Sequence, residues 1–107
     1  MSQFDDRAKA QEAKFARDGE LRFKAEARRN RLLGQWAAAE MGLSGEAAAA
    51  YAAEVVAADF EEAGDEDVFR KISADFAARD TQVTEAAIRA KMAELVQVAR
   101  DQVLAEG

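Results

Sequence analysis

The chain has 107 residues, which suits one domain with a modest core and leaves no room for a second. It contains no Pro and only six Gly, and half of its residues are hydrophobic, many of them Ala, so the composition favours helix over sheet. The absence of Cys excludes disulfides and thiolate sites, and the formal net charge of -6 makes the chain as a whole a poor binder of nucleic acid.

The first 19 residues are compatible with a helix but carry few apolar side chains. After the initial Met, Phe4 and Phe15 are the only large apolar residues, and four acidic side chains balance four basic ones. At 100° per residue the two aromatics fall on one narrow arc. A short helix with so thin an apolar stripe is marginal in water. We therefore expect residues 1–19 to form a flexible or weakly helical arm, disordered when free, and residues 20–107 to form the folded domain.

Two amphipathic helices are expected next. The first covers about residues 20–41 and has apolar residues at helical spacing: Leu21, Ala25, Leu32, Leu33, Trp36, Ala37 and Met41. Gly42 can supply the left-handed residue that commonly closes a helix, and Ser44 is placed to cap the following one. The second helix, over about 45–62, has its expected buried side at Tyr51, Val55, Val56, Phe60 and Ala63.

Two further helices complete the predicted fold. A short helix is expected over about 66–79, with Asp65 as its N-cap and an apolar face of Val68, Phe69, Ile72 and Phe76. The last is expected over about 85–105 after the cap Thr84, with the most regular apolar spacing of the chain: Ile88, Met92, Leu95, Val96, Ala99 and Val103. Short connections favour antiparallel neighbours, so the sequence predicts an all-α protein, a four-helix bundle.

The residues that usually perform catalysis are scarce. There is no His or Cys, and neither the phosphate-binding loop motif nor the dinucleotide-binding glycine motif occurs. We therefore expect no enzymatic activity and no cofactor. The acidic stretch between Asp59 and Asp67 lacks the ligand spacing of an EF-hand, so it is interpreted as capping residues and a solvated acidic face, and no metal site is expected.

Positive charge is concentrated in residues 20–36, where five basic and two acidic side chains give +3. The cluster consists of Lys24, Arg28, Arg29 and Arg31. One interpretation is a solvated helix flank; others are an anion site or a secondary docking surface for a partner. A nucleic-acid interface is disfavoured because no aromatic residues interleave the cluster in the pattern such sites use.

Several segments in order resemble one known family: FDDR at residues 4–7, EAKFA at 12–16, FKAEARRNRLLGQWAA at 23–38 and EVVAADFEEAGDEDVFRKISADF at 54–76. Together they resemble the zeta subunit of the F-type ATP synthase of alphaproteobacteria. The likeness covers nearly the whole chain and is weakest from Ala77 onward. It implies a small helical inhibitor of ATP hydrolysis whose N-terminal arm acts in a way similar to the mitochondrial ATPase inhibitor.

The resemblance also implies which residues act and on what. The inhibitory segment of the family maps onto Phe4, Asp5, Asp6, Arg7, Lys9, Glu12, Lys14 and Phe15. Its expected partner is the catalytic head of the ATP synthase, with its alpha, beta and gamma subunits, where the arm inserts as a helix at a catalytic interface and blocks hydrolytic rotation. Gly19 stands where we would expect an acidic residue, and the lack of His means that the histidine-based pH control of the mitochondrial inhibitor does not carry over.

The sequence also supports expectations about location, oligomeric state and an alternative function. No run of about 18 apolar residues and no secretory signal occur, so we expect a cytoplasmic protein, not embedded in the membrane but peripheral to the inner membrane through the ATP synthase. It should be a monomer when free and should bind no nucleic acid. The alternative is a helical adaptor or regulatory module that binds another protein, or nucleic acid, through the basic helix over residues 22–31.

Overall fold

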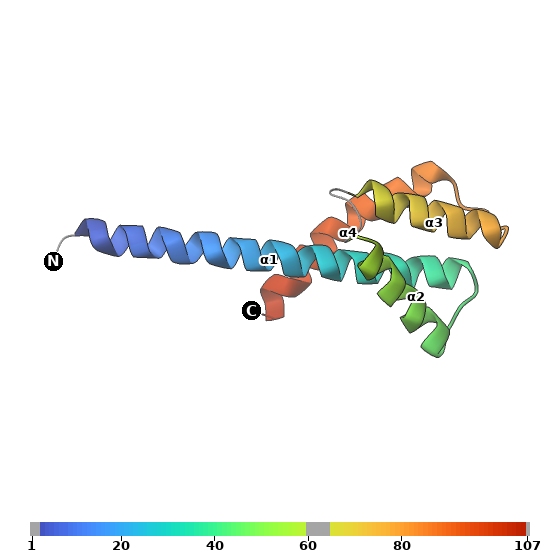
Figure 1. Ribbon diagram of the computed structural model, residues 1–107, viewed down its shortest axis with the longest axis horizontal. Coiled ribbons are helices and arrows are strands. Elements are labelled where there is room, and N and C mark those ends of the chain that lie inside the picture. The colour runs from blue at the N-terminus through green and yellow to red at the C-terminus, as the bar shows by residue number, and fades with distance from the viewer. Residues whose placement is uncertain (1–2, 60–64, 107) are drawn as a thin grey trace.

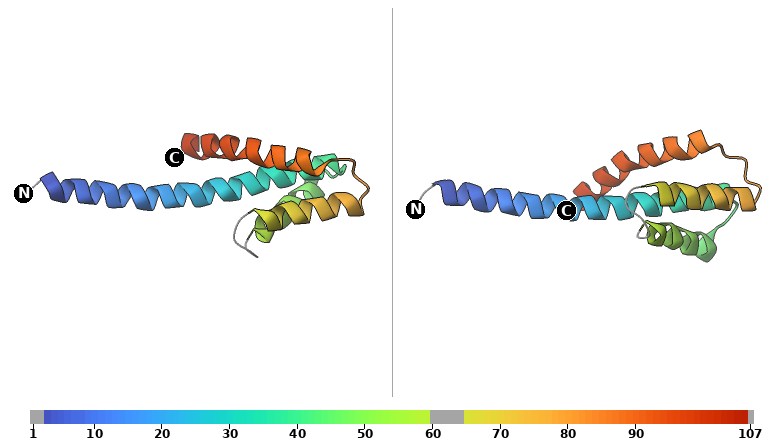
Figure 2. Two further views of the ribbon diagram at one scale, coloured as in Figure 1. Left: turned by 90° about the horizontal axis from the view of Figure 1, so that it is seen from above. Right: turned by 45° about the horizontal axis from the view of Figure 1, so that its top comes forward.

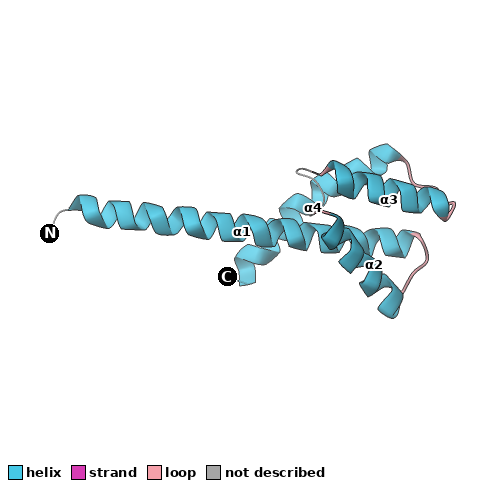
Figure 3. Ribbon diagram, viewed as in Figure 1, coloured by secondary structure: helices cyan, strands magenta, loops and turns pink. Residues whose placement is uncertain are grey.

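The computed structural model describes residues 3–59 and 65–106, and the side chains of residues 19–59 and 65–106. The described chain consists of four helices and no strand (Figure 3). Their bounds are α1 Gln3–Glu40, α2 Gly45–Ala58, α3 Glu66–Ala78 and α4 Glu85–Glu106. The prediction of an all-α, four-helix bundle is therefore confirmed.

The other three helices pack around the C-terminal half of α1. α2 and α4 make most of the contacts with α1, and α3 packs mainly against α2 and α4. The N-terminal part of α1 extends as a single rod beyond the ends of the other helices, and the C-terminal end of α4 lies beside the middle of α1 (Figures 1 and 2). The molecule is consequently elongated, with principal extents of 66 × 26 × 21 Å.

The first helix is longer than predicted. It was expected to begin near residue 20, and it begins at Gln3 and passes through Gly19 without a break. A single exposed Gly lowers helix propensity by only about 1 kcal/mol relative to Ala, and no Pro interrupts the segment. The start and end of the other helices agree closely with the sequence-based bounds, except that the expected end of α2 and its residues Phe60 and Ala63 lie outside the described residues.

The core gathers the apolar faces that the periodicity predicted. The largest fully buried apolar side chains are Leu33, Val55, Val68, Ile72 and Ile88. They form one cluster with Ala37, Ala38, Tyr51, Phe69, Phe76 and Met92. Trp36 is partly buried and packs against this cluster, with its ring edge-to-face with Phe76 and centroids 5.8 Å apart, in agreement with its expected place on the apolar face of the helix.

α1 and α2 cross at their closest point at Gly34. A Cβ atom placed on Gly34 would lie 2.6 Å from the Cα of Ala52 and 3.2 Å from the Cβ of Val55. The approach of the two backbones therefore requires the absence of a side chain at this position. It brings α2 close enough to α1 for Val55 to be completely buried.

The helix ends match the predicted positions, and Gly42 and Thr84 act as predicted, whereas Ser44 does not. Gly42 has a φ of +80° after α1, and the N–H of Leu43 donates to the carbonyl of Ala38 at 2.8 Å, which closes the helix as expected. Thr84 also acts as predicted, since its Oγ1 accepts the N–H of Ala87 at 3.1 Å. Ser44 occupies the N-cap position of α2 without making a side-chain capping bond.

Asp65 likewise occupies the N-cap position of α3 without making a capping bond. The prediction was right about the position and wrong about the interaction, because the carboxylate of Asp65 binds Arg29 of α1 instead. The ion pair between Arg29 of α1 and Asp65 thus takes the place of the expected hydrogen bond from a backbone N–H of α3 to Asp65.

Candidate functional site

The expected inhibitory arm occupies the free N-terminal part of α1. Its predicted site residues all lie on this helix: Phe4, Asp5, Asp6, Arg7, Lys9, Glu12, Lys14 and Phe15. Their side chains lie outside those that the structure describes. What the structure adds is the backbone path, which places this segment on the same helix that the bundle holds, projecting away from it (Figure 1).

The structure separates Arg29 from the other three basic residues predicted as an anion or docking site. Arg29 is only 4% exposed. Its Nε donates to Oδ1 of Asn30 at 2.9 Å, and one of its terminal nitrogens donates to Oδ1 of Asp65 at 2.8 Å. Arg29 therefore joins α1 to the start of α3, and its positive charge is paired with a carboxylate of the same protein.

Two carboxyl groups near Arg29 have pKa values shifted in opposite directions. The hydrogen bond from Arg29 holds the pKa of Asp65 below its usual range. Burial raises the pKa of Asp59 despite a hydrogen bond with Asn30 and the nearby positive charge of Arg29. Asn30 is itself 1% exposed, so the polar groups of α1, α2 and α3 meet here in one partly buried network. Its role is to fix the helices relative to one another.

Arg28 joins α1 to the end of α4. Its guanidinium donates to Oε1 of Gln102 at 2.9 Å and forms an ion pair with Glu106 at 2.6 Å. Together the two contacts hold the last turn of α4 against α1 at the point where the arm leaves the bundle.

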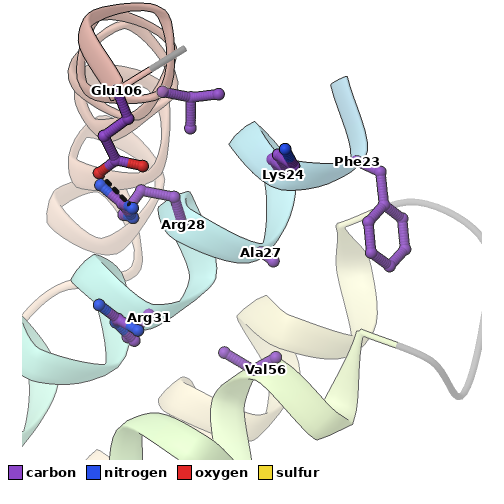
Figure 4. A pocket seen from close by; sticks show the side chains of 8 residues that line it. Phe23, Lys24, Ala27, Arg28, Arg31, Val56 and Glu106 are labelled. Carbon is purple, nitrogen blue, oxygen red and sulfur yellow. Dashed lines mark ion pairs between the residues drawn. The ribbon is translucent and has the colours of Figure 1, made fainter. Parts of the chain in front are cut away.

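Lys24 and Arg31, the other two predicted cations, are exposed and share a surface hollow with Arg28. The hollow has a volume of about 300 Å³ and opens between α2 and α4 over α1. Figure 4 shows Arg28 directed toward Glu106 of α4, whereas Phe23 and Val56 lie on the α2 side. The structure thus brings three of the four basic residues to one surface.

Phe23 is the residue that the sequence analysis missed. It is 60% exposed, whereas the other large apolar residues of α1 whose side chains are described, Leu21, Leu32, Leu33 and Trp36, are buried or partly buried. At 100° per residue it lies roughly opposite Leu21 and Ala25, and this is the signal that could have identified it. The same spacing places Asn30 on the arc of Leu33, which accounts for its burial.

The remaining polar clusters connect helices of the bundle. Tyr51 donates to Asp75 at 2.7 Å, and burial together with this bond raises the pKa of Tyr51. Arg89 makes two hydrogen bonds of 3.1 Å to Glu66, and its guanidinium lies 3.9 Å above the ring of Phe69. Each cluster joins neighbouring helices, and none contains a nucleophile beside a base.

The described residues contain neither a metal-binding cluster nor a membrane-spanning helix. No group of three or more acidic side chains in residues 19–59 and 65–106 is arranged to hold a metal ion. In the same part of the chain no helix is both long enough and apolar enough to cross a membrane.

Comparison with known families decides the identity. Over residues 1–102 the sequence matches the family described as ATPase inhibitor subunit zeta. The chain belongs to this family. The match to the zeta family includes both the projecting segment of α1 and nearly all of the bundle. It confirms the resemblance seen in the sequence, and the family description indicates an ATPase inhibitor in general.

Structural comparison agrees with this assignment. The chain is similar to a protein with a solution NMR structure, with a TM-score of 0.73 and 53% sequence identity over 81% of this chain and 99% of that one. No curated protein matches the chain. At this level of sequence identity we expect the two proteins to share the same fold and the same core packing.

Proposed function

We propose that the protein inhibits ATP hydrolysis by the F-type ATP synthase through the N-terminal arm of α1. Membership of the zeta family supports an ATPase inhibitor in general. The single structural observation that supports the arm as the acting part is the projection of α1 beyond the other three helices (Figure 1). Residues 1–19 form the inhibitory arm in this proposal, and residues 20–107 form the bundle that carries it.

In this mechanism the arm inserts as a helix at an interface between catalytic and noncatalytic subunits near the central shaft. Phe4 and Phe15 supply the apolar contacts, and Arg7, Lys9 and Lys14 pair with acidic groups of the enzyme. The inserted helix obstructs rotation in the hydrolytic direction. If the arm is disordered when free, ordering it costs on the order of 1 to 2 kcal/mol per residue in backbone entropy, so two aromatic anchors are not sufficient and many weaker contacts must accompany them.

The test is a titration of ATPase activity. Purified ATP synthase without its own inhibitor is mixed with increasing amounts of the wild-type chain, of a Phe4→Ala, Phe15→Ala variant, and of a variant that begins at Glu20. The shortened variant retains every residue of the described core cluster. We expect wild type to suppress hydrolysis, the double variant to do so weakly, and the shortened variant to have no effect. A folded, shortened variant that inhibited as fully as wild type would refute the proposal.

A further inference from the structure

A groove on α1 combines an exposed aromatic side chain with positive charge. We call this surface the α1 groove; it is lined by Phe23, Lys24, Ala27, Arg28, Arg31 and Val56. Phe23 is 60% exposed, and beside it lies the open hollow of about 300 Å³ (Figure 4). A lone exposed Phe is ordinary, but an exposed Phe at the edge of a hollow resembles the anchors of protein interfaces.

The charges of the groove are available to a partner. Within the described residues neither Lys24 nor Arg31 has an ion-pair partner. Among the described residues that line the hollow, the only carboxylate belongs to Glu106, and it is paired with Arg28. The surface is therefore positive, in a protein whose net charge is -6.

The spacing of these groups favours a protein surface over a small anion. Lys24 and Arg31 are seven residues apart on one helix, which separates them by about 10 Å along its axis. They are too far apart to converge on one phosphate, but they can each meet a different carboxylate of an acidic surface. The hollow is also open to solvent and at the lower end of the volumes that bind small molecules, which suits a single partner side chain.

We propose that the α1 groove is a second docking site, which binds an acidic segment of the ATP synthase catalytic head that presents an apolar side chain between its carboxylates. This inference rests on the proposed function. Phe23 lies only about 12 Å along the helix from Phe15, at 1.5 Å per residue, so the protein that receives the arm is within reach of the groove. The groove captures the enzyme and aligns α1, whereas the arm stops rotation.

The two sites therefore control different quantities. Loss of the groove should raise the inhibitor concentration that gives half-inhibition and leave the inhibition at saturation unchanged. Loss of the arm anchors should reduce the inhibition at saturation. Charge reversal at an interface acts mainly on the association rate and its dependence on salt.

The experiment uses full-length variants with matched controls from the other flank of α4. Charge reversal in the groove, Lys24→Glu and Arg31→Glu made singly and together, is compared with Arg100→Glu, which matches each single change in charge. Phe23→Ala is compared with Leu104→Ala, since Leu104 is 61% exposed and lines a different hollow. Binding to the catalytic head is measured without turnover, and ATPase titrations are run in parallel. Urea denaturation monitored by Trp36 fluorescence confirms that each variant is folded.

We expect the double charge reversal to weaken binding by about tenfold, the lower end of the range of electrostatic steering, and to flatten its salt dependence. Phe23→Ala should weaken binding by about fivefold. Groove variants that bind no more weakly than their controls would overturn the proposal, as would a stronger loss of wild-type binding in inorganic phosphate than in chloride of equal ionic strength. If the groove variants bind weakly while the Phe4→Ala, Phe15→Ala variant still inhibits fully at saturation, the arm mechanism fails and the docking site stands.

Discussion

The close approach of α1 and α2 at Gly34 predicts that a single added methyl group destabilises the bundle. In Gly34→Ala the new Cβ would lie 2.6 Å from the Cα of Ala52, whereas ordinary contacts begin at 3.4 Å, so the two helices must separate by about 0.8 Å. The obstacle is backbone, so a change of rotamer cannot relieve it. Overpacking costs about 1 to 3 kcal/mol, and the upper end applies here. Ala gains about 1 kcal/mol in helix propensity over Gly, which leaves a net loss of about 2 kcal/mol.

The matched control is the same substitution at Gly19 of the same helix. A Cβ there meets no atom within 4 Å, so Gly19→Ala carries the gain in propensity without the clash. Stability is measured by urea and thermal unfolding with fluorescence of Trp36, the only Trp, which contacts Phe76 in the core. A loss of about 2 kcal/mol should lower the melting temperature of Gly34→Ala by about 10 °C. If Gly34→Ala is as stable as wild type, the helix crossing described here is wrong.

Three further predictions concern the network, a cap and the arm. Arg29→Met should destabilise the protein by about 2 to 3 kcal/mol at neutral pH, less than a fully buried pair because Asp65 is half-exposed and can be hydrated. Arg29 lowers the pKa of Asp65 in the folded state, so the difference in unfolding free energy between wild type and Arg29→Met should be complete above the ordinary aspartate pKa of 3.8. This difference should disappear as the pH falls through the lower pKa that Asp65 has in the folded protein. Equal differences in the free energy of urea unfolding at pH 7 and at acid pH would contradict this prediction. Thr84→Ala removes the bond to the N–H of Ala87 and should cost about 1 kcal/mol in the same assay, whereas an unchanged midpoint would exclude a capping role. Gly19→Ala should lower the half-inhibitory concentration in the ATPase titration by up to about fivefold if the free arm must be ordered on binding, and no change would indicate that the arm is already helical.

The helices of the bundle could be predicted because apolar spacing and capping residues depend only on neighbours within one or two helical turns. The apolar spacing of Ile88 and Met92 and the cap at Thr84 identify α4 directly, and both features are present in the structure. The bounds of α1 differ from the expected bundle helix over about residues 20–41, because the helix continues from Gln3 through the segment expected to be a flexible or weakly helical arm, and one exposed Gly does not interrupt it.

Contacts between distant residues could not be predicted from the sequence in this way. Asp65 looked like a local cap, and only the fold brings it to Arg29, which is 36 positions away. The basic cluster was recognised as a group, but its division into buried, paired and exposed members depends on where α3 and α4 lie. The arm residues were inferred from the family resemblance and from the spacing of Phe4 and Phe15, and their contacts stay a prediction.

Because α1 is one continuous helix, the arm and the bundle move together as a rigid unit. The segment from Gln3 to Gly19 is about 25 Å long at 1.5 Å per residue, so a tilt of the bundle by about 10° displaces the tip of the arm by about 4 Å. Contacts that fix the orientation of the bundle therefore also determine the position of the distant tip of the arm. Substitution of Arg28, which removes the contacts between α1 and the end of α4, should therefore alter inhibition through the angle of the arm while every residue of the arm itself is unchanged.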